Sequence, residues 1–487
     1  MWLAPETLLI LTILVPLFAV PGIIAANRFP NRREGVTITA SIILIYLVTT
    51  LYGLVQDGTS IAIKGPALFP GLHLSFEIEP LGMLFSLVAG FLWLVTTVYA
   101  IGYMRGHHEK NQTRFYSCFA IAISSVMGIS YAGNLLTLFI FYEVLTLSTY
   151  PLVTHSGTPK AKEGGRVYLG VLLSTSVLFL LLAIVATWYT AGTVEFQKGG
   201  VFPPETAPII TGTLLVLYIF GIGKAAIMPF HRWLPAAMVA PTPVSALLHA
   251  VAVVKAGVFS VLKVCVYIFG LDLLRTLPSA DFMLYLAAAT VLLASIVAMR
   301  QDNLKARLAY STVSQLGYIT IGALLATNAG IVGGAMHIAM HAFGKITLFF
   351  CAGAIMVAAH KTEISDMRGL GKSMPITMIA FFIGSLSIIG LPPTGGTWGK
   401  WFIMTGAFDA GKWTIMIVLM LSSLLNIAYL LPIPLRAFFS KQAYGKPVQI
   451  KEAPLPSLLA LSFTALGCIF LFFYTQPLYE LASAILQ

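Results

Sequence analysis

Charged residues are scarce in this chain. Only 10% of its 487 residues are Asp, Glu, Lys or Arg, whereas 58% are hydrophobic. The mean hydropathy of +0.89 is too high for a soluble globular protein, so the composition predicts a polytopic membrane protein. The first apolar stretch, residues 7–26, lacks a basic leader and a small-residue cleavage site. We therefore expect it to be a retained membrane helix and not a signal peptide.

Cysteine is also rare, and the few cysteines are isolated. The four (Cys118, Cys265, Cys351 and Cys468) show no C-x-x-C spacing, which argues against a zinc site, an iron–sulfur cluster or a disulfide framework. A P-loop is missing, and no G-x-G-x-x-G follows a strand. The sequence thus predicts no cofactor, no metal and no redox centre. The net charge of +11 is better explained by cytoplasmic loops than by a nucleic-acid partner.

Long apolar windows predict fourteen membrane spans joined by short loops, and no soluble domain. These spans are expected to begin near residues 6, 36, 81, 114, 134, 166, 208, 243, 282, 304, 330, 374, 412 and 454. The fold class is therefore an all-α polytopic membrane protein.

Lysine and arginine predict the orientation of these spans. The loops that follow even-numbered spans carry only Lys64, Lys198, Arg275 and Lys412, whereas those that follow odd-numbered spans carry most of the 29 basic residues, from Arg28 to Lys441, Lys446 and Lys451. Because short cytoplasmic loops are enriched in basic residues, we expect both termini on the outer side of the cell (inner or plasma) membrane.

Two spans are interrupted beside a lysine. The seventh reads GIGKAAIMPF around Lys224, and the twelfth reads GLPPTGGTWGKW around Lys400. Broken backbone is tolerated at membrane depth only beside protein or water, and its helix ends act on ions. Interrupted segments five spans apart indicate two five-helix repeats of inverted topology, spans 4–8 and 9–13. We assign residues 1–113 to spans 1–3, 114–270 and 271–441 to the repeats, and 442–487 to the last span.

Other ionisable residues also lie inside predicted spans, where charge is costly and usually functional. Glu143 is the one acid deep in a span, and a packing role is its alternative. Lys224 and Lys263 could instead extend toward the interface, and His249 could be a core histidine. His337, His341 and Lys345 recur every fourth residue and form a polar stripe about 12 Å long on one helix face. With Lys255, they indicate a path for protons. A metal site is disfavoured, because the acid of H-E-x-x-H is missing.

Three segments resemble the antiporter-like subunits shared by respiratory complex I, Mrp cation/proton antiporters and membrane-bound hydrogenases. They are PFHRWLPAAMVAPTPVSALLHAVAVVKAG, LKARLAYSTVSQLGYI and MHIAMHAFGKITLFF. The resemblance implies a fourteen-helix fold with a central hydrated axis, no redox centre in this chain, and other membrane subunits as partners. The loop Asp302–Ala306 departs from the family pattern by displacing its acid and losing a second basic residue, and we expect this loop to be structural.

The resemblance also implies roles for the ionisable residues. Glu143 corresponds to the acid of the fifth helix, which keeps the lysine at position 224 protonated. The proton then moves to Lys255, passes along the stripe on helix eleven, and leaves through Lys400 on helix twelve. With His249, which the residue pattern alone suggests, the predicted proton-translocating set is Glu143, Lys224, His249, Lys255, His337, His341, Lys345 and Lys400.

Three functions are compatible with this resemblance. The favoured prediction is a large subunit of an Mrp-type cation/proton antiporter, similar to the D-type one, which moves protons and Na⁺ or K⁺ through the lipid bilayer. The first alternative is a proton-pumping subunit of a complex I-like NADH:quinone oxidoreductase or a membrane-bound hydrogenase. The second alternative is a subunit that couples the same path to the uptake of inorganic carbon or another solute.

Overall fold

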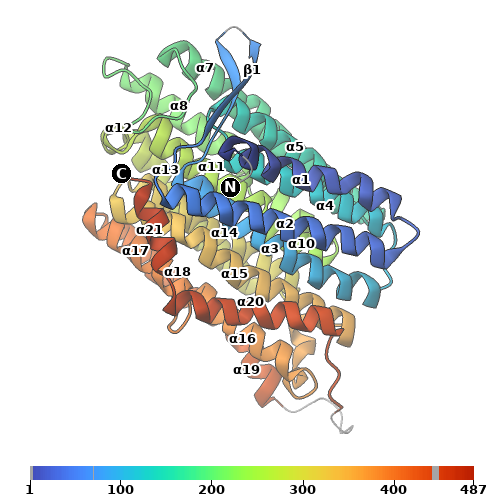
Figure 1. Cartoon of the computed structure of the whole chain (residues 1–487). Helices are drawn as coiled ribbons and strands as arrows, with labels where there is room; N and C mark the ends of the chain where they lie inside the picture. Colours follow the sequence, from blue (N-terminus) through green and yellow to red (C-terminus); the bar gives the residue numbers. More distant parts are fainter. Residues whose placement is uncertain (1–3, 70, 441–448) are drawn as a thin grey trace.

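The computed structural model describes residues 4–69, 71–440 and 449–487 (Figure 1). Long helices that run roughly side by side make up almost all of the described chain. Ten of these helical segments are long and apolar enough to cross a membrane. With the interrupted and more polar helices, the described elements make fourteen passes, and the prediction of an all-α polytopic fold is confirmed.

The passes differ in how continuous they are. Nine are single helices: α1 (Pro5–Ala25), α2 (Pro30–Gln56), α3 (Pro80–Gly106), α4 (Gln112–Ser130), α5 (Leu135–Val153), α13 (Pro278–Arg300), α14 (Leu304–Leu324), α15 (Asn328–Ala359) and α20 (Leu455–Phe473). Three are helices that continue through π-helical turns or a short bend: α6 (Pro159–Thr175) with η1 (Ser176–Leu180) and α7 (Leu181–Ala191); α10 (Thr242–Ala246) with η4 (Leu247–Val251), α11 (Val253–Val264) and η5 (Cys265–Phe269); and α18 (Trp413–Leu430) with α19 (Pro432–Phe439).

The seventh and twelfth passes are interrupted, as the sequence predicted. The seventh consists of α8 (Pro208–Gly221), the 3₁₀ turn η2 (Gly223–Ala225), α9 (Trp233–Ala236) and η3 (Ala237–Val239). The twelfth consists of α16 (Pro375–Ile389) and α17 (Gly396–Asp409). Shorter elements lie between passes or after the last one: α12 (Leu271–Thr276), η6 (Ile364–Met367), η7 (Leu370–Lys372) and α21 (Gln476–Ala484).

The observed helices begin close to the predicted positions. The largest differences are at α2, which begins at Pro30 and not near residue 36, and at α6, which begins at Pro159 and not near residue 166. In both cases a proline at the first helical position starts the helix before the apolar run, because proline is favoured there. The first turns of α2 and α6 carry basic residues, which the apolar windows used for the prediction had excluded.

The molecule has two distinct ends. The hairpin end carries the antiparallel strands β1 (Ala62–Phe69) and β2 (Leu72–Glu77), and both the start of α1 and the last helix, α21, lie toward it (Figure 1). The basic end carries the loops at residues 26–29, 107–111, 154–158, 301–303 and 360–374. The helical periodicity of the sequence did not predict the hairpin, which the chain attaches to the helices through Glu77 N–H and Tyr131 O at 2.7 Å.

The two proposed repeats run in opposite directions. The fourth pass begins at the basic end, whereas the ninth begins at the hairpin end, because each unit contains an odd number of passes. The boundary assigned between residues 441 and 442, and the basic residues Lys441 and Lys446, lie outside the described part of the chain.

Candidate functional site

The break in the seventh pass holds Lys224 in the protein interior. α8 ends at Gly221, and Ala226 adopts a left-handed conformation (φ 55°) after the turn. The Lys224 ammonium donates to Tyr142 O at 2.9 Å and to Thr146 Oγ1 at 2.6 Å, and it lies 3.1 Å from the centroid of the Tyr142 ring. The lysine is completely buried, so the alternative in which it reaches the interface is wrong.

Glu143 follows Tyr142 on α5, but it does not contact Lys224. Among the described residues no ion pair joins Glu143 to Lys224, and both carboxylate oxygens of Glu143 are buried without a hydrogen-bond partner. A direct pair at this position, which the resemblance implied, is therefore not formed in this structure. Tyr142 takes its place, because its carbonyl and its ring both face the ammonium.

Helix α11 crosses the break at very short range. A Cβ atom at Gly257 would lie 2.3 Å from Lys224 C and 2.4 Å from Ala225 N, so only glycine allows this approach. The crossing places Lys255, two residues earlier on α11, beside the broken pass.

We expect Gly257→Ala to impair both folding and transport, because the new methyl group meets backbone and not a movable side chain. Overpacking of this kind typically costs about 1–3 kcal/mol. The melting temperature of the purified protein and its transport rate measure the effect. Gly170→Ala is the matched control, since nothing lies within 4 Å of its Cβ position on α6. Equal stability of the two variants would contradict the close crossing.

The centre of the axis is a direct contact between Lys255 and His341. The Lys255 ammonium contacts His341 Nδ1, and both side chains are buried. The other ring nitrogen of His341, Nε2, is buried and has no hydrogen-bond partner within residues 4–69, 71–440 and 449–487. His337 lies one turn away, with its ring centroid 5.9 Å from that of His341, and its Nε2 is 3.1 Å from Gln315 Oε1 on α14.

Lys345, the last member of the predicted stripe, turns toward α14. Its ammonium donates to Ser311 Oγ at 2.6 Å, and Tyr429 OH on α18 donates to the same oxygen at 2.9 Å. The stripe is thus on one helix, as the spacing predicted, but Lys345 faces a hydroxyl cluster and not its neighbouring histidine.

The second break holds Lys400 in the same way as the first holds Lys224. Its ammonium donates to Ile389 O at 3.0 Å, which is the last carbonyl of α16. It also donates to Ser423 Oγ at 3.3 Å and lies 4.5 Å from the Tyr318 ring centroid. The break leaves this helix-end carbonyl free to accept, and the negative end of the helix dipole favours the cation. Tyr318 also lies against His337, with ring centroids 6.0 Å apart.

His249 is buried on η4, apart from the other members. Neither ring nitrogen has a hydrogen-bond partner among the described residues, and its ring centroid is 4.9 Å from that of Phe349. The structure thus joins Lys255, His341, His337 and Lys400 through contacts or ring neighbours, whereas Lys224, His249 and Lys345 lie beside this series without direct contact to it.

Sequence reasoning did not identify the polar partners of these cations. Helix α14 supplies Ser311, Gln315 and Tyr318, at positions i, i+4 and i+7, to three of them. This spacing could have identified a polar face turned toward the stripe. Among the residues that the structure describes, no group of three or more metal-ligating side chains lies together.

Lys263 has a partner that the sequence did not suggest. Its ammonium is 2.9 Å from Glu79 Oε1, at the start of α3, and donates to Ala132 O at 2.5 Å. The side chain is fully buried, so the alternative in which it extends to the interface is wrong. The two passes are held together at the hairpin end by this buried ion pair.

Comparison with known proteins gives consistent matches. The family described as "NADH:quinone oxidoreductase/Mrp antiporter, TM" matches residues 132–426, and "NADH-Ubiquinone oxidoreductase (complex I), chain 5 N-terminus" matches residues 71–116. NADH-quinone oxidoreductase subunit N of Desulforudis audaxviator is 33% identical over 391 residues, which are 80% of this chain and 77% of the relative. The chain spans 63% or less of the length of several NAD(P)H-quinone oxidoreductase chain 5 relatives.

Two solved assemblies contain a chain of the same fold. A chain of the Mrp complex from Dietzia sp. matches 98% of this chain and 97% of its own length, with a TM-score of 0.83 and 21% identity. A chain of the membrane-bound sulfane sulfur reductase, an archaeal respiratory membrane complex, matches 98% of both chains with a TM-score of 0.85 and 22% identity.

The matched region covers more than half of the chain and contains both broken passes and the buried lysines, and the relatives are subunits of multisubunit membrane complexes. The chain therefore belongs to the NADH:quinone oxidoreductase/Mrp antiporter family, as a membrane-embedded, proton-translocating antiporter-like subunit.

Proposed function

We propose that protons cross this subunit along the buried series Lys255, His341, His337 and Lys400. Lys224, at the first break, exchanges protons with this series without touching it, and Glu143, His249 and Lys345 lie beside it. The observation that carries the proposal is the Lys255–His341 contact, which lies between the two broken passes. Ionisable side chains at membrane depth are costly and usually mark the pathway of an ion or proton.

The two ring nitrogens of His341 are placed so that the imidazole can take up a proton on one side and release it on the other. Lys255 contacts one ring nitrogen, while the other is buried and free. A neutral imidazole can accept a proton at one nitrogen and release one from the other. Rotation of His341 toward His337 would then bring the proton within reach of the Tyr318 and Lys400 region.

We further propose that the basic end faces the cytoplasm and both termini face outward. Arg32, Arg105, Lys160 and Arg368 all belong to loops or to the ends of helices at the basic end. The hairpin end has few basic side chains, of which Lys412 is paired with Asp281 at 2.7 Å. This distribution follows the enrichment of basic residues in cytoplasmic loops.

Three reactions are candidates for driving the movement of protons through this subunit. Several relatives with 30% identity or more are quinone oxidoreductase subunits, which favours a redox-driven proton pump. The assignment to an Mrp antiporter as its D-type large component, which the sequence favoured, is supported by likeness of fold to the Mrp complex and stays the second candidate. Coupling to inorganic carbon is the third outcome of the experiment below.

The test measures the pH gradient across vesicles from cells that express the whole gene cluster. We expect a gradient to build when an electron donor such as NADH or hydrogen is supplied, and Lys255→Ala to abolish it, because the alanine breaks the series at the Lys255–His341 contact. Cation-dependent dissipation without a donor would assign the chain to an antiporter. Bicarbonate-dependent dissipation would support solute coupling. Equal rates for the wild type and Lys255→Ala in every condition would refute the proton path.

A further inference from the structure

A cavity of about 710 Å³, with both polar and apolar residues in its wall, lies at the basic end. Its wall includes Tyr103, Glu109, Ser156, Thr242, Lys305 and Glu363. These residues come from α3, from the loops before α4 and α6, from the starts of α10 and α14, and from the loop after α15. The cavity therefore lies where the two repeats meet, directly above the helix that carries His249 and Lys255.

Titratable groups converge on Glu109 at this cavity. One carboxylate oxygen, Oε1, is 3.1 Å from His107 Nδ1, and the other, Oε2, is 3.8 Å from His155 Nε2. His155 is buried, and neither of its ring nitrogens has a hydrogen-bond partner in the part of the chain that the structure describes. Burial lowers the pKa of His155, although the Glu109 carboxylate opposes this effect. Glu109 thus has an imidazole on each side and an open cavity in front.

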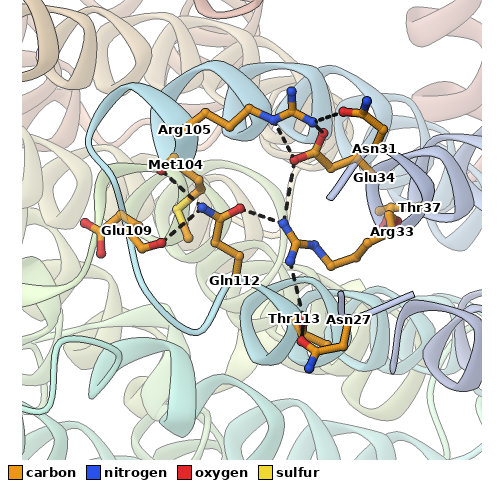
Figure 2. A network of polar contacts seen from close by, with 10 residues as sticks. All are labelled: Asn27, Asn31, Arg33, Glu34, Thr37, Met104, Arg105, Glu109, Gln112 and Thr113. Carbon is orange, nitrogen blue, oxygen red and sulfur yellow. Dashed lines mark hydrogen bonds and ion pairs between the residues drawn. The ribbon is translucent and has the colours of Figure 1, made fainter. Parts of the chain in front are cut away.

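A separate network fixes the loop that presents Glu109 (Figure 2). Gln112 donates to Glu109 O at 3.0 Å and to Met104 O at 3.3 Å. Arg33 donates to Gln112 Oε1 at 2.7 Å and lies 3.7 Å from Glu34, which also pairs with Arg105. In Figure 2 the Glu109 side chain points away from this network, so the network holds the loop backbone and leaves the carboxylate available.

The floor of the cavity leads toward the buried axis. Thr242 begins α10, and His249 follows seven residues later on the same helical run, roughly 10 Å deeper at 1.5 Å per residue. Both ring nitrogens of His249 are buried and unpartnered. Beside Thr242, the Lys305 ammonium donates to Ala240 O at 2.5 Å, so a cation also lines the inner wall.

We propose that this cavity is the aqueous port through which protons reach the axis from the basic end, with Glu109 collecting them at the mouth and His249 receiving them below the floor. The inference rests on the proposed proton path and adds its entrance. It also gives a use to the unpartnered imidazole of His249. The 590 Å³ cavity at residues 45–49, 87–91 and 463–478 has an almost wholly apolar wall, and such a wall cannot stabilise a charge in transit.

Chemical blockage tests the port. We choose Ser156→Cys at the cavity wall, in a Cys118→Ser background that removes the one native thiol that is not buried. A membrane-impermeant, positively charged methanethiosulfonate, applied to the basic end, is expected to slow proton translocation about tenfold, because a fixed cation at the mouth repels protons. Dithiothreitol should restore the rate.

Glu163→Cys is the matched control, because Glu163 is exposed on α6 at the same end and does not line the cavity. Its modification should leave the rate unchanged. Glu109→Gln, without any reagent, is expected to slow translocation by a similar factor, and Glu163→Gln is not. Assembly of all variants is followed by co-purification of the partner subunits.

Lys255→Ala separates the two proposals. If Lys255→Ala abolishes transport while fully modified Ser156→Cys and Glu109→Gln both keep the wild-type rate, the entrance is wrong and the axis stands. If Lys255→Ala also transports normally, the axis itself is wrong. The port is supported if proton translocation slows in modified Ser156→Cys and in Glu109→Gln, while modified Glu163→Cys and Glu163→Gln keep the wild-type rate.

Discussion

Replacing Lys224 with alanine is expected to reduce proton translocation to the background rate and to leave the subunit assembled. The Lys224 ammonium is a fully buried titratable cation at the first break, so its loss removes the proton-binding group from the interior at that point. Its partners do not depend on it. Thr146 Oγ1 also donates to Tyr142 O at 3.1 Å, so both acceptors keep a hydrogen bond in the variant. Initial rates in vesicles and co-purification of partner subunits measure the two effects.

Lys224→Arg distinguishes proton transfer from a need for positive charge. Arginine keeps the charge but is effectively never deprotonated in proteins, so we expect this variant to be as inactive as the alanine variant. Lys162→Ala, at an exposed position of α6, is the control and should transport normally. Wild-type rates in Lys224→Ala would show that protons bypass the first break.

The separation of Glu143 from Lys224 changes how the first break is understood. The ammonium here is stabilised by a carbonyl dipole, a hydroxyl and an aromatic face, none of which titrates near neutral pH. Glu143 retains a buried carboxylate with no partner. An ionised Glu143 favours the charged form of the lysine, and it would do so more strongly at contact distance.

The two breaks were predictable from the sequence because their signals are local. Gly221 and Gly223 before Lys224, and Gly390 with its paired prolines before Lys400, interrupt apolar runs that are otherwise continuous. The stripe of His337, His341 and Lys345 was likewise visible, since helical spacing alone places the three on one face. Such signals are informative in a membrane protein, because the backbone groups of a span are normally satisfied within its own helix and an interruption is therefore conspicuous.

Contacts between distant segments were not predictable in the same way. No spacing in the sequence relates Glu79 to Lys263, or Ser311 to Lys345 and Tyr429. Lys255 and Lys263 both lie on α11, and the sequence favoured Lys255 as the relay group without identifying the partner of either; one contacts a histidine and the other a carboxylate. The identity of the partner, and not burial, therefore separates a candidate relay group from a structural ion pair.

Lys263→Met is expected to destabilise the protein by about 3–5 kcal/mol, because removing one partner of a buried ion pair leaves the other charge uncompensated. Glu79 would keep a buried carboxylate whose second oxygen, Oε2, already lacks a partner. Burial raises the pKa of Glu79, and Lys263 opposes that effect. Loss of the lysine should raise this pKa further. The destabilisation should then be small near pH 4.5, the ordinary value for the group, and should grow as the pH rises and the isolated carboxylate is forced to ionise.

The double variant Glu79→Gln/Lys263→Met supplies the matched comparison, since it removes both charges from the same site. We expect it to recover most of the stability at neutral pH, because an apolar replacement of a buried ion pair is often neutral or stabilising. Thermal unfolding of purified protein at pH values from about 5 to 8 measures both variants. A double variant as unstable as Lys263→Met would mean that the lysine acts through Ala132 O and the Phe196 ring and not through Glu79. Normal transport in a stable double variant would assign the pair to structure and leave proton movement to Lys255 and the histidines.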